Sequence, residues 1–554
     1  MPRTSTLWLV ALMLGSFMLP LASAQSTATP IKHIVVIFNE NISFDHYFGV
    51  YPVATNPPGE PAFNAQPGTP SVNGLSGGLL TNNPNFVNAL NGAGAANPFR
   101  LDRSQALTAD QNHAYLPEQE AFDSGLMDLF PKYVGSAGPP PAPLSGQTVT
   151  NTKGLNLGYY DGNTVTAMWN YAQNYALNDN SFGTTFGPST PGVINLVSGQ
   201  TNGITEILNG QSNSFEVDDG NGNYSLVGDS DPIGDVCSSP TRNQVQMTGK
   251  NIGDLLSAAG VTWGGFMGGF NLAITNPNGT TGCSRSSSSA IVPATTDYIP
   301  HHAFFQYYAS TSNPMHTRPT SVHSIGHNGD AGNHDYDIND FFAAVQAGNF
   351  PAVSFLKAPA YQDAHPGYSD PLDEQKFVVD TINFLQNSPE WVTTVVVVAY
   401  DDSDGWYDHQ MSPIVNQSVS PADALTGPGA CGSAANAMKG LAGLPAQGRC
   451  GYGPRMPMLV ISPWAKKNFV DHTLTDQTSI IHFIEDNWLN GQRIGNGSFD
   501  VLSNSIASML DFGPERATAV NQGCMLILDD ETGQVVPVFQ GYGCSTRQYY
   551  YPNY

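Results

Sequence analysis

The chain has few charged residues, and its positive charges are especially scarce. Asp, Glu, Lys and Arg make up 12% of the 554 residues, whereas an ordinary soluble domain has roughly 25%. The 20 Lys and Arg face 45 Asp and Glu, which gives a formal net charge of -25. Proteins that bind nucleic acid need a basic surface, so this composition argues against such a partner. An anionic substrate would need a local positive charge, which a bound cation can supply.

Long hydrophobic runs are also missing. The apolar segment from Leu7 to Leu14 is too short to cross a bilayer, and no later stretch approaches a membrane span. Arg3 precedes this segment and Ala22-Ser23-Ala24 follows it, which is the pattern of a secretory signal. We therefore predict a signal peptide over residues 1–24, no transmembrane anchor, and a mature protein that is secreted or periplasmic.

Cysteines are few, and none has the spacing of metal ligands. The chain has six cysteines, and an even number in an exported protein predicts structural disulfides. Several connectivities are possible. Pairing of nearest neighbours would give Cys237–Cys283, Cys431–Cys450 and Cys524–Cys544.

Two distant segments share one pattern, an apolar strand followed by oxygen ligands. The first, residues 34–38, leads to Glu40 and Asn41, and an equally apolar run leads to Asp401 and Asp402. In open α/β sheets, ligands bind outside the carboxyl ends of the strands. Adjacent aspartates repel each other unless a cation lies between them. We predict that these four residues hold one divalent metal ion (calcium, magnesium, manganese, zinc or iron), although turn formers and a solvated acidic loop would give the same pattern.

The remaining patterns predict an α/β fold. Further strands are expected at 261–267, 352–356 and 458–461, and helices at 243–259, 337–346, 374–385 and 478–488, the last capped by Asp476. Strands that alternate with amphipathic helices predict a central, mostly parallel sheet flanked by helices. Gly- and Ser-rich stretches are expected to form long loop insertions, and residues 25–554 a single domain.

Ser189 lies in the segment Gly187-Pro188-Ser189-Thr190-Pro191-Gly192. Gly-Pro predicts a turn, Ser189 or Thr190 would cap a helix, and Pro191 suits the first helical turn. A capping role is the common one for such a serine. A helix N-terminus also favours phosphate and an alkoxide, so a serine beside a cation is a candidate nucleophile.

Four histidines are candidate catalytic residues. They lie in polar, loop-like surroundings, at His113, His301, His302 and His365. A single histidine more often has a structural role. An acidic enzyme with few lysines would nevertheless need histidines to bind phosphoryl oxygens and to protonate a leaving group.

Several motifs resemble one known family. They are the segment from Ile31 to Gly49, the serine segment at 187–192, Tyr298 to His302, Gln362 to Gln375, Tyr400 to His409, and Gly453 to Pro457. With these, the chain resembles the bacterial phosphoesterases that include secreted acid phosphatases and phosphatidylcholine-type phospholipases C. The resemblance covers nearly the whole mature chain.

The resemblance implies an alkaline phosphatase-like core and a role for each position. Ser189 matches the nucleophile, which is threonine in many phospholipase members. Glu40, Asn41, Asp401 and Asp402 match the metal ligands, and His113, His302 and His365, with His301 beside them, match histidines around the phosphoryl group. The implied activity is metal-assisted hydrolysis of phosphate esters through a phosphoserine intermediate.

The sequence leaves three alternatives. A phospholipase C acting on phosphatidylcholine or sphingomyelin would need an apolar lip, for which Phe304, Phe305, Tyr307 and Tyr308 are candidates, although such aromatics are more often core. A secreted binding protein could keep the fold without catalysis. A sulfatase is disfavoured because the serine motif lacks its arginine. The serine nucleophile favours the phosphatase branch.

Overall fold

The computed structural model describes residues 26–536, with gaps at 136, 139–140, 145, 210–215, 219–222, 419–422, 426–430, 432–448 and 521–524. The expected signal peptide and the expected Cys524–Cys544 bridge lie outside the described residues. Within the described part, no helix is long and apolar enough to cross a bilayer.

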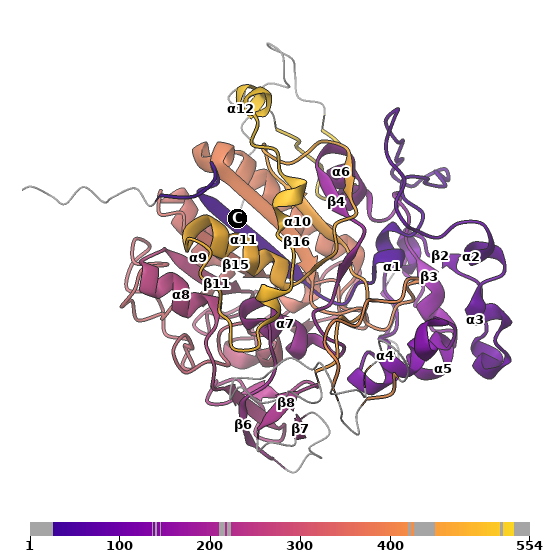
Figure 1. The fold of residues 1–554 in the computed structure, drawn as a ribbon, viewed down its shortest axis with the longest axis horizontal. Coiled ribbons are helices and arrows are strands. Elements are labelled where there is room, and N and C mark those ends of the chain that lie inside the picture. Colours follow the sequence, from indigo (N-terminus) through magenta and orange to yellow (C-terminus); the bar gives the residue numbers. More distant parts are fainter. Residues whose placement is uncertain are drawn as a thin grey trace, which may run out of the picture.

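An eight-stranded sheet forms the centre of the molecule (Figure 1). Its order is β14 (Asp335–Asp337), β11 (Trp263–Met267), β15 (Val353–Lys357), β1 (His33–Asn39), β16 (Thr394–Tyr400), β17 (Met458–Ile461), β4 (Ala176–Asn178) and β18 (Phe469–Asp471). All neighbours are parallel except β17, which is antiparallel to both β16 and β4. The predicted mostly parallel α/β sheet is confirmed.

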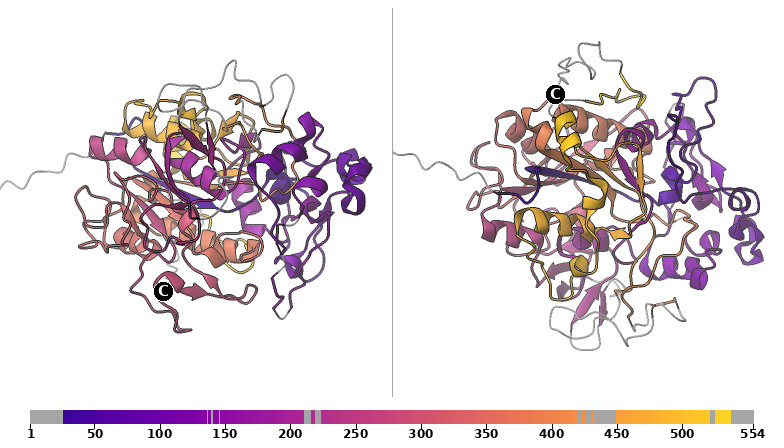
Figure 2. Two further views of the ribbon diagram at one scale, coloured as in Figure 1. Left: turned by 90° about the horizontal axis from the view of Figure 1, so that it is seen from below. Right: turned by 45° about the horizontal axis from the view of Figure 1, so that its top comes forward.

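The two central strands are apolar along their whole length because helices cover both faces of the sheet. All of β16 is buried, and so is β1 beyond His33. One layer contains α9 (Ile338–Gln346) and α10 (Pro371–Gln386), and the other contains α7 (Ser189–Ser198), α8 (Ile252–Ala259) and α11 (Thr478–Trp488). Figure 2 shows the orange α10 and the yellow α11 on opposite sides of the sheet.

Two local predictions differ from the structure. The helix expected over 243–259 is split, because β10 (Gln244–Met247) comes first and Asn251 then caps the shorter α8 through a capping box with Asp254. Asp476 is not the cap of α11, whose N-cap is Gln477. The Asp476 carboxylate instead accepts hydrogen bonds from the hydroxyls of Thr184 and Thr478.

A smaller lobe lies beside the sheet and is drawn in indigo and purple in Figure 1. We call residues 78–159 the side lobe. They form α2 (Gly78–Thr81), α3 (Pro84–Val87), β2 (Phe99–Arg100), α4 (Tyr115–Phe122), α5 (Phe130–Tyr133) and β3 (Gly158–Tyr159). The lobe has its own apolar cluster, which includes Phe122, Phe130 and Val134 and extends to Phe186 and Tyr407. These last two residues flank the segments that carry Ser189 and Asp402, so the lobe packs directly against the edge of the sheet that carries the predicted site.

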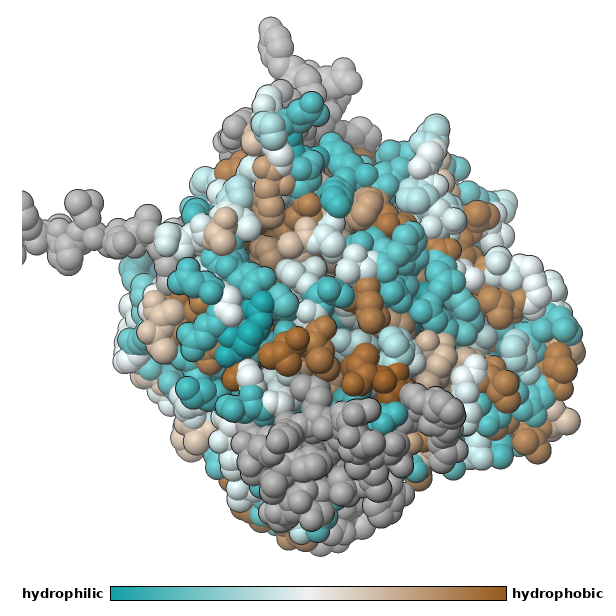
Figure 3. Space-filling model, in the orientation of Figure 1, coloured by the Kyte–Doolittle hydropathy of each residue, from teal (hydrophilic) through white to brown (hydrophobic). Residues whose placement is uncertain are grey.

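The remaining elements are short. They are α1 (Phe44–Phe48), α6 (Thr166–Asn174), β5 (Ser181–Phe182), β6 (Ile204–Ile207), β7 (Glu216–Asp218), β8 (Tyr224–Leu226), β9 (Asp231–Pro232), β12 (Ser286–Ser287), β13 (Thr295–Thr296), β19 (Thr475–Asp476) and α12 (Pro514–Val520). On the face in Figure 3, hydrophobic and hydrophilic residues are interspersed.

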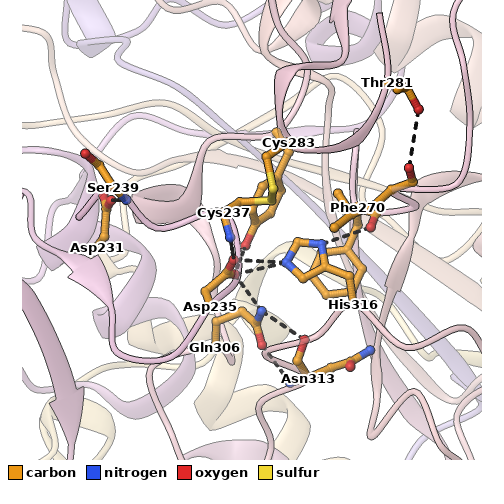
Figure 4. The surroundings of a disulfide bond; sticks show 12 residues. Asp231, Asp235, Cys237, Ser239, Phe270, Thr281, Cys283, Gln306, Asn313 and His316 are labelled. Atoms are coloured by element: carbon orange, nitrogen blue, oxygen red, sulfur yellow. Dashed lines mark hydrogen bonds and ion pairs between the residues drawn. A yellow bond between two sulfur atoms is a disulfide. The ribbon is translucent and has the colours of Figure 1, made fainter. Parts of the chain in front are cut away.

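Two of the expected disulfides are present, Cys237–Cys283 and Cys431–Cys450. Figure 4 shows the first beside the buried carboxylate of Asp235, which lies 3.1 Å from His316 Nε2 and accepts a hydrogen bond from the Cys237 amide at 2.7 Å. This bridge therefore anchors a hydrogen-bonded loop, as expected for a structural disulfide.

Candidate functional site

The predicted acidic residues meet at the carboxyl edge of the sheet. β1 and β16 pair in parallel up to Asn39 and Tyr400. Glu40 and Asp401 are the residues that immediately follow these two strands. The backbone N–H of Asn41 donates to Asp401 Oδ1 at 3.1 Å, across 360 positions of sequence. Glu40, Asn41, Asp401 and Asp402 are all buried. The two strand ends form one cluster, as the sequence predicts.

Ser189 lies against this cluster. It is the first residue of α7, after the N-cap residue Pro188, and its hydroxyl does not cap the helix. Its Oγ lies 3.0 Å from Glu40 Oε2 and 3.2 Å from Asp402 Oδ2. A hydroxyl has one hydrogen, so it satisfies one of these two carboxylate oxygens at a time, which suits a site that also holds a cation.

The start of α7 approaches the end of β16 very closely. A Cβ added to Gly192 would lie 2.3 Å from the Asp401 carbonyl oxygen, so no larger residue fits there without a shift. Thr190 is held by Asp229, whose carboxylate accepts from the Thr190 amide at 3.0 Å and from its hydroxyl at 2.9 Å. These contacts fix the helix that carries Ser189 against the metal-ligand candidates.

Three of the four predicted histidines surround the cluster. His302 Nδ1 lies 3.0 Å from Glu40 Oε1. His113 lies 3.4 Å from Asp404 through Nδ1 and 3.5 Å from Asn41 through Nε2. The ring of His365 lies edge-on to that of His113, with 5.8 Å between centroids.

The fourth histidine, His301, has a different environment. Its ring contacts that of His302, and its Nδ1 lies 3.7 Å from Asp231. Its carbonyl accepts a hydrogen bond from Thr190 Oγ1 at 3.1 Å. These contacts place His301 beside the nucleophile segment, next to the acidic cluster.

The structure adds residues to the site that the sequence analysis did not select. Lys357, the last residue of β15, forms ion pairs with Glu40 and, at 3.2 Å, with Asp401. Asp363 lies 3.9 Å from His302, and Asp404 joins through His113 and Asn41. A lysine at the end of an apolar strand, on the same edge as the acidic residues, was the available signal for Lys357.

The electrostatics of the site show an excess of buried negative charge. Burial, with the neighbouring Glu40, raises the pKa of Asp401 to about 7. Burial also raises the pKa of Asp363, Asp402 and Asp404 well above the usual range. Burial opposes ionisation of Glu40 as well, but the charge of Lys357 keeps its pKa low. Carboxyl groups in such a cluster ionise together only when a cation compensates them.

The residues present fit a divalent metal ion. Two groups, Glu40 with His302 and Asp363, and His113 with His365 and Asp404, each place their ligand atoms within 4.8 Å of one another. Asn41 Oδ1 is buried, and no hydrogen-bond donor among the described residues reaches it. A buried amide oxygen beside carboxylates is a normal ligand for a hard cation.

Two other clusters with metal-ligand spacing have different explanations. Asp45, Asp408 and His409 surround the guanidinium of Arg455, which compensates their charge. The group of Asp235, His316 and Cys237 contains a sulfur that is already in a disulfide. Both clusters are therefore structural.

Comparison with known proteins identifies the family of this chain. The sequence model described as "Phosphoesterase family" matches residues 31–489. A non-hemolytic phospholipase C of Pseudomonas aeruginosa is 24% identical over 460 residues, which cover 82% of this chain and 53% of that protein. Phospholipase C A of Mycobacterium tuberculosis is 23% identical over 82% of this chain and 72% of its own length.

Other similarities are shorter or more distant. A non-hemolytic phospholipase C of Burkholderia pseudomallei is 34% identical over 26% of this chain and 19% of its own length. The solved structure of murine ectonucleotide pyrophosphatase/phosphodiesterase 5 has a TM-score of 0.29, with 14% identity, over 63% of this chain and 95% of that chain. This chain spans about half the length of the Pseudomonas relative. The family match extends from before β1 to the end of α11 and so contains every predicted site residue, and the chain belongs to the phosphoesterase family.

Proposed function

We propose that the protein is an exported, metal-assisted phosphoesterase of the acid phosphatase type, with Ser189 as the nucleophile. The observation that carries this proposal is the position of Ser189 Oγ between Glu40 Oε2 and Asp402 Oδ2. A divalent ion held by Glu40, Asn41, Asp401 and Asp402 would lower the pKa of the hydroxyl and neutralise phosphoryl oxygens.

The reaction is a two-step transfer. Ser189 Oγ forms a bond to phosphorus as the bond from phosphorus to the alcohol oxygen breaks, which leaves a phosphoserine. A histidine gives its proton to the departing alkoxide. Two histidines lie beside the cluster, and His365 is the candidate, because burial lowers the pKa of His302 well below its usual range and keeps that ring neutral. Water then displaces the serine and releases phosphate.

The substitution Ser189→Ala tests this mechanism. We expect hydrolysis of a soluble phosphomonoester to fall by about 10³-fold or more, since the nucleophile and the catalytic groups act as a unit. Ser198→Ala is the matched control, because Ser198 is a buried serine of the same helix that bonds the Ile194 and Gln200 carbonyls. If Ser189→Ala turns over like wild type, Ser189 is not the nucleophile.

Phospholipase C activity is the second candidate, and it is favoured because the relatives from Pseudomonas aeruginosa and Mycobacterium tuberculosis are phospholipases C. The aromatics considered as a lip, Phe304, Phe305, Tyr307 and Tyr308, are buried in the core and cannot form one. The side lobe does expose apolar side chains, at Phe86, Val87, Leu90 and Leu126. Comparing turnover of p-nitrophenyl phosphate with that of phosphatidylcholine vesicles separates the two activities.

A non-catalytic binding protein is the remaining alternative. It predicts no hydrolysis of any phosphoester, soluble or lipid, by protein supplied in turn with calcium, magnesium, manganese, zinc and iron. Elemental analysis of protein purified from the culture medium and from the periplasm would identify both the metal and the compartment.

A further inference from the structure

A buried carboxylate on α10 connects the last residues of the two strands that lead into the site. Glu374 Oε1 accepts hydrogen bonds from Asn39 Nδ2 at 2.9 Å and from the Tyr400 hydroxyl at 2.8 Å. Glu374 Oε2 accepts from the Tyr47 hydroxyl at 2.8 Å. All four side chains are buried, so no solvent competes for these bonds, and each bond is correspondingly costly to lose.

Two of these bonds hold residues that lie directly before metal-ligand candidates. Asn39 and Tyr400 are paired neighbours in the sheet, and each immediately precedes a metal-ligand candidate, Glu40 or Asp401. One oxygen atom of Glu374 therefore holds both strand ends one residue before the cluster. The third bond, to Tyr47, reaches α1 and does not hold a strand end.

The opposite face of the sheet holds the same strand end by its backbone. Gln477 Nε2, at the start of α11, donates to the carbonyls of Tyr400 at 3.2 Å and of Asp401 at 2.6 Å. The end of β16 is thus held from both helical layers. On the α10 side, the side-chain bond to Tyr400 also couples β16 to β1 through Asn39.

We propose that Glu374 is a positioning residue, which sets the separation of Glu40 and Asp401 so that they bind one divalent cation. This inference rests on the proposed metal-assisted function. Glu374 touches neither the cation ligands nor the substrate, and it acts through Asn39 and Tyr400. If Glu374 had only a structural role, loss of its bond to Tyr400 and loss of its bond to Tyr47 would both lower stability, and they would have the same effect on the site.

Two tyrosine substitutions make that distinction. Tyr400→Phe and Tyr47→Phe each remove one 2.8 Å hydrogen bond from the same carboxylate, and both tyrosines are buried. Metal-free protein is titrated calorimetrically with Mn²⁺, Ca²⁺ and Zn²⁺ in turn, and the ion that wild type binds most tightly is used for all variants. We expect Tyr400→Phe to raise the dissociation constant about tenfold and Tyr47→Phe to change it less than twofold.

Substitution of Glu374 itself provides a rescue test. Glu374→Met removes the acceptor, and we expect it to weaken cation binding at least as much as Tyr400→Phe. Glu374→Gln keeps one acceptor oxygen for Asn39 and Tyr400, and its amide can donate to the Tyr47 hydroxyl. We therefore expect Glu374→Gln to recover most of the affinity that Glu374→Met loses.

A second readout is independent of any metal. The amides of Asn41 and Asp402 both donate to Asp401 Oδ1, at 3.1 and 2.9 Å, so their hydrogen exchange reports the position of Asp401. In metal-free protein, we expect Tyr400→Phe to accelerate exchange at both amides about tenfold and Tyr47→Phe to leave it near the wild-type rate. Equal effects of the two variants, or none, on this exchange would overturn the role of Glu374. Wild-type protein that binds no cation, with the exchange difference intact, would instead overturn the proposed metal-assisted function.

Discussion

Two buried acidic clusters follow the same two strands and differ in how their charge is compensated. The strand-end cluster consists of Glu40, Asp363, Asp401, Asp402 and Asp404, and its permanent cationic partner is Lys357. The arginine cluster, a few residues further along both segments, consists of Asp45, Asp408, His409 and Arg455. There, Arg455 bonds Asp45 at 3.1 Å and Asp408 at 3.0 Å, and His409 lies 2.7 Å from Asp45.

This difference distinguishes the strand-end cluster, a candidate functional site, from the arginine cluster, which has a structural role. Burial raises the pKa of Asp408 to about 6, and the charge of Arg455 opposes that rise. In the strand-end cluster, burial raises the pKa of Asp402 and Asp404 well above the usual range; neighbouring carboxylates add to this rise, and the charge of His113 opposes it. Uncompensated buried charge is costly to stability, and perturbed carboxyl groups of this kind concentrate at functional sites.

The largest expected effect is on stability, in the arginine cluster. Arg455→Met would leave Asp45 and Asp408 buried without their cation, and we expect the free energy of unfolding to fall by about 3–5 kcal/mol. Urea unfolding measures this loss. Arg318→Met is the control, because Arg318 pairs with Asp340 at the surface with 39% of its side chain exposed, and we expect it to cost less than about 1 kcal/mol. Equal losses would remove the distinction between the two pairs.

In the strand-end cluster, the corresponding test removes a carboxylate charge instead of the compensating cation. Asp402→Asn removes one of the crowded charges, so we expect unchanged or increased stability of the metal-free protein. Turnover of a phosphomonoester should fall about 10²–10³-fold, or about 3–4 kcal/mol in the barrier. Asp408→Asn should show the reverse, with lower stability and near-normal turnover while folded. Loss of stability in Asp402→Asn without loss of turnover would contradict the comparison.

A divalent cation should stabilise the folded protein by binding at the strand-end cluster and not at the arginine cluster. At about 100 times its dissociation constant, a divalent ion that binds the folded state adds about 2.7 kcal/mol to the free energy of unfolding. We expect a chelator to abolish this gain in wild type and Asp402→Asn to lack it. A gain that survives in Asp402→Asn would place the ion elsewhere in the molecule.

For each group taken singly, the smallest expected effect is the pH dependence of the metal-free protein. Burial raises the pKa of Glu118 and Glu374 from 4.5 to about 7. Between these values the folded state binds protons that the unfolded state releases, so stability falls as pH rises from about 4.5 to 7, by about 2 kcal/mol for each group. Denaturant unfolding at pH 5 and 7.5 measures the change, and Glu374→Gln should reduce it. Greater stability at pH 7.5 would reverse the sign and refute the prediction.

Parts of the site were predictable because their signal is local. Residues 34–38 and 395–400 read as buried strands, and both are strands in the sheet. The serine segment predicted a helix start, and α7 begins at Ser189. The split of the helix expected at 243–259 was missed because an apolar pattern continued through β10 into α8. Short apolar runs do not separate strand from helix by periodicity alone.

The sequence by itself determined which polar groups follow the central strands, since an apolar run of β-branched residues followed by carboxylates can be recognised without knowledge of tertiary contacts. It also determined that those groups would meet, because the carboxyl ends of parallel strands lie on one edge of a sheet. Only the tertiary structure decided that Lys357 compensates Glu40, that Arg455 compensates the second cluster, and that Glu374 holds both strand ends. Those contacts join residues more than 25 positions apart, and single side chains at such separations leave no periodic trace in a sequence.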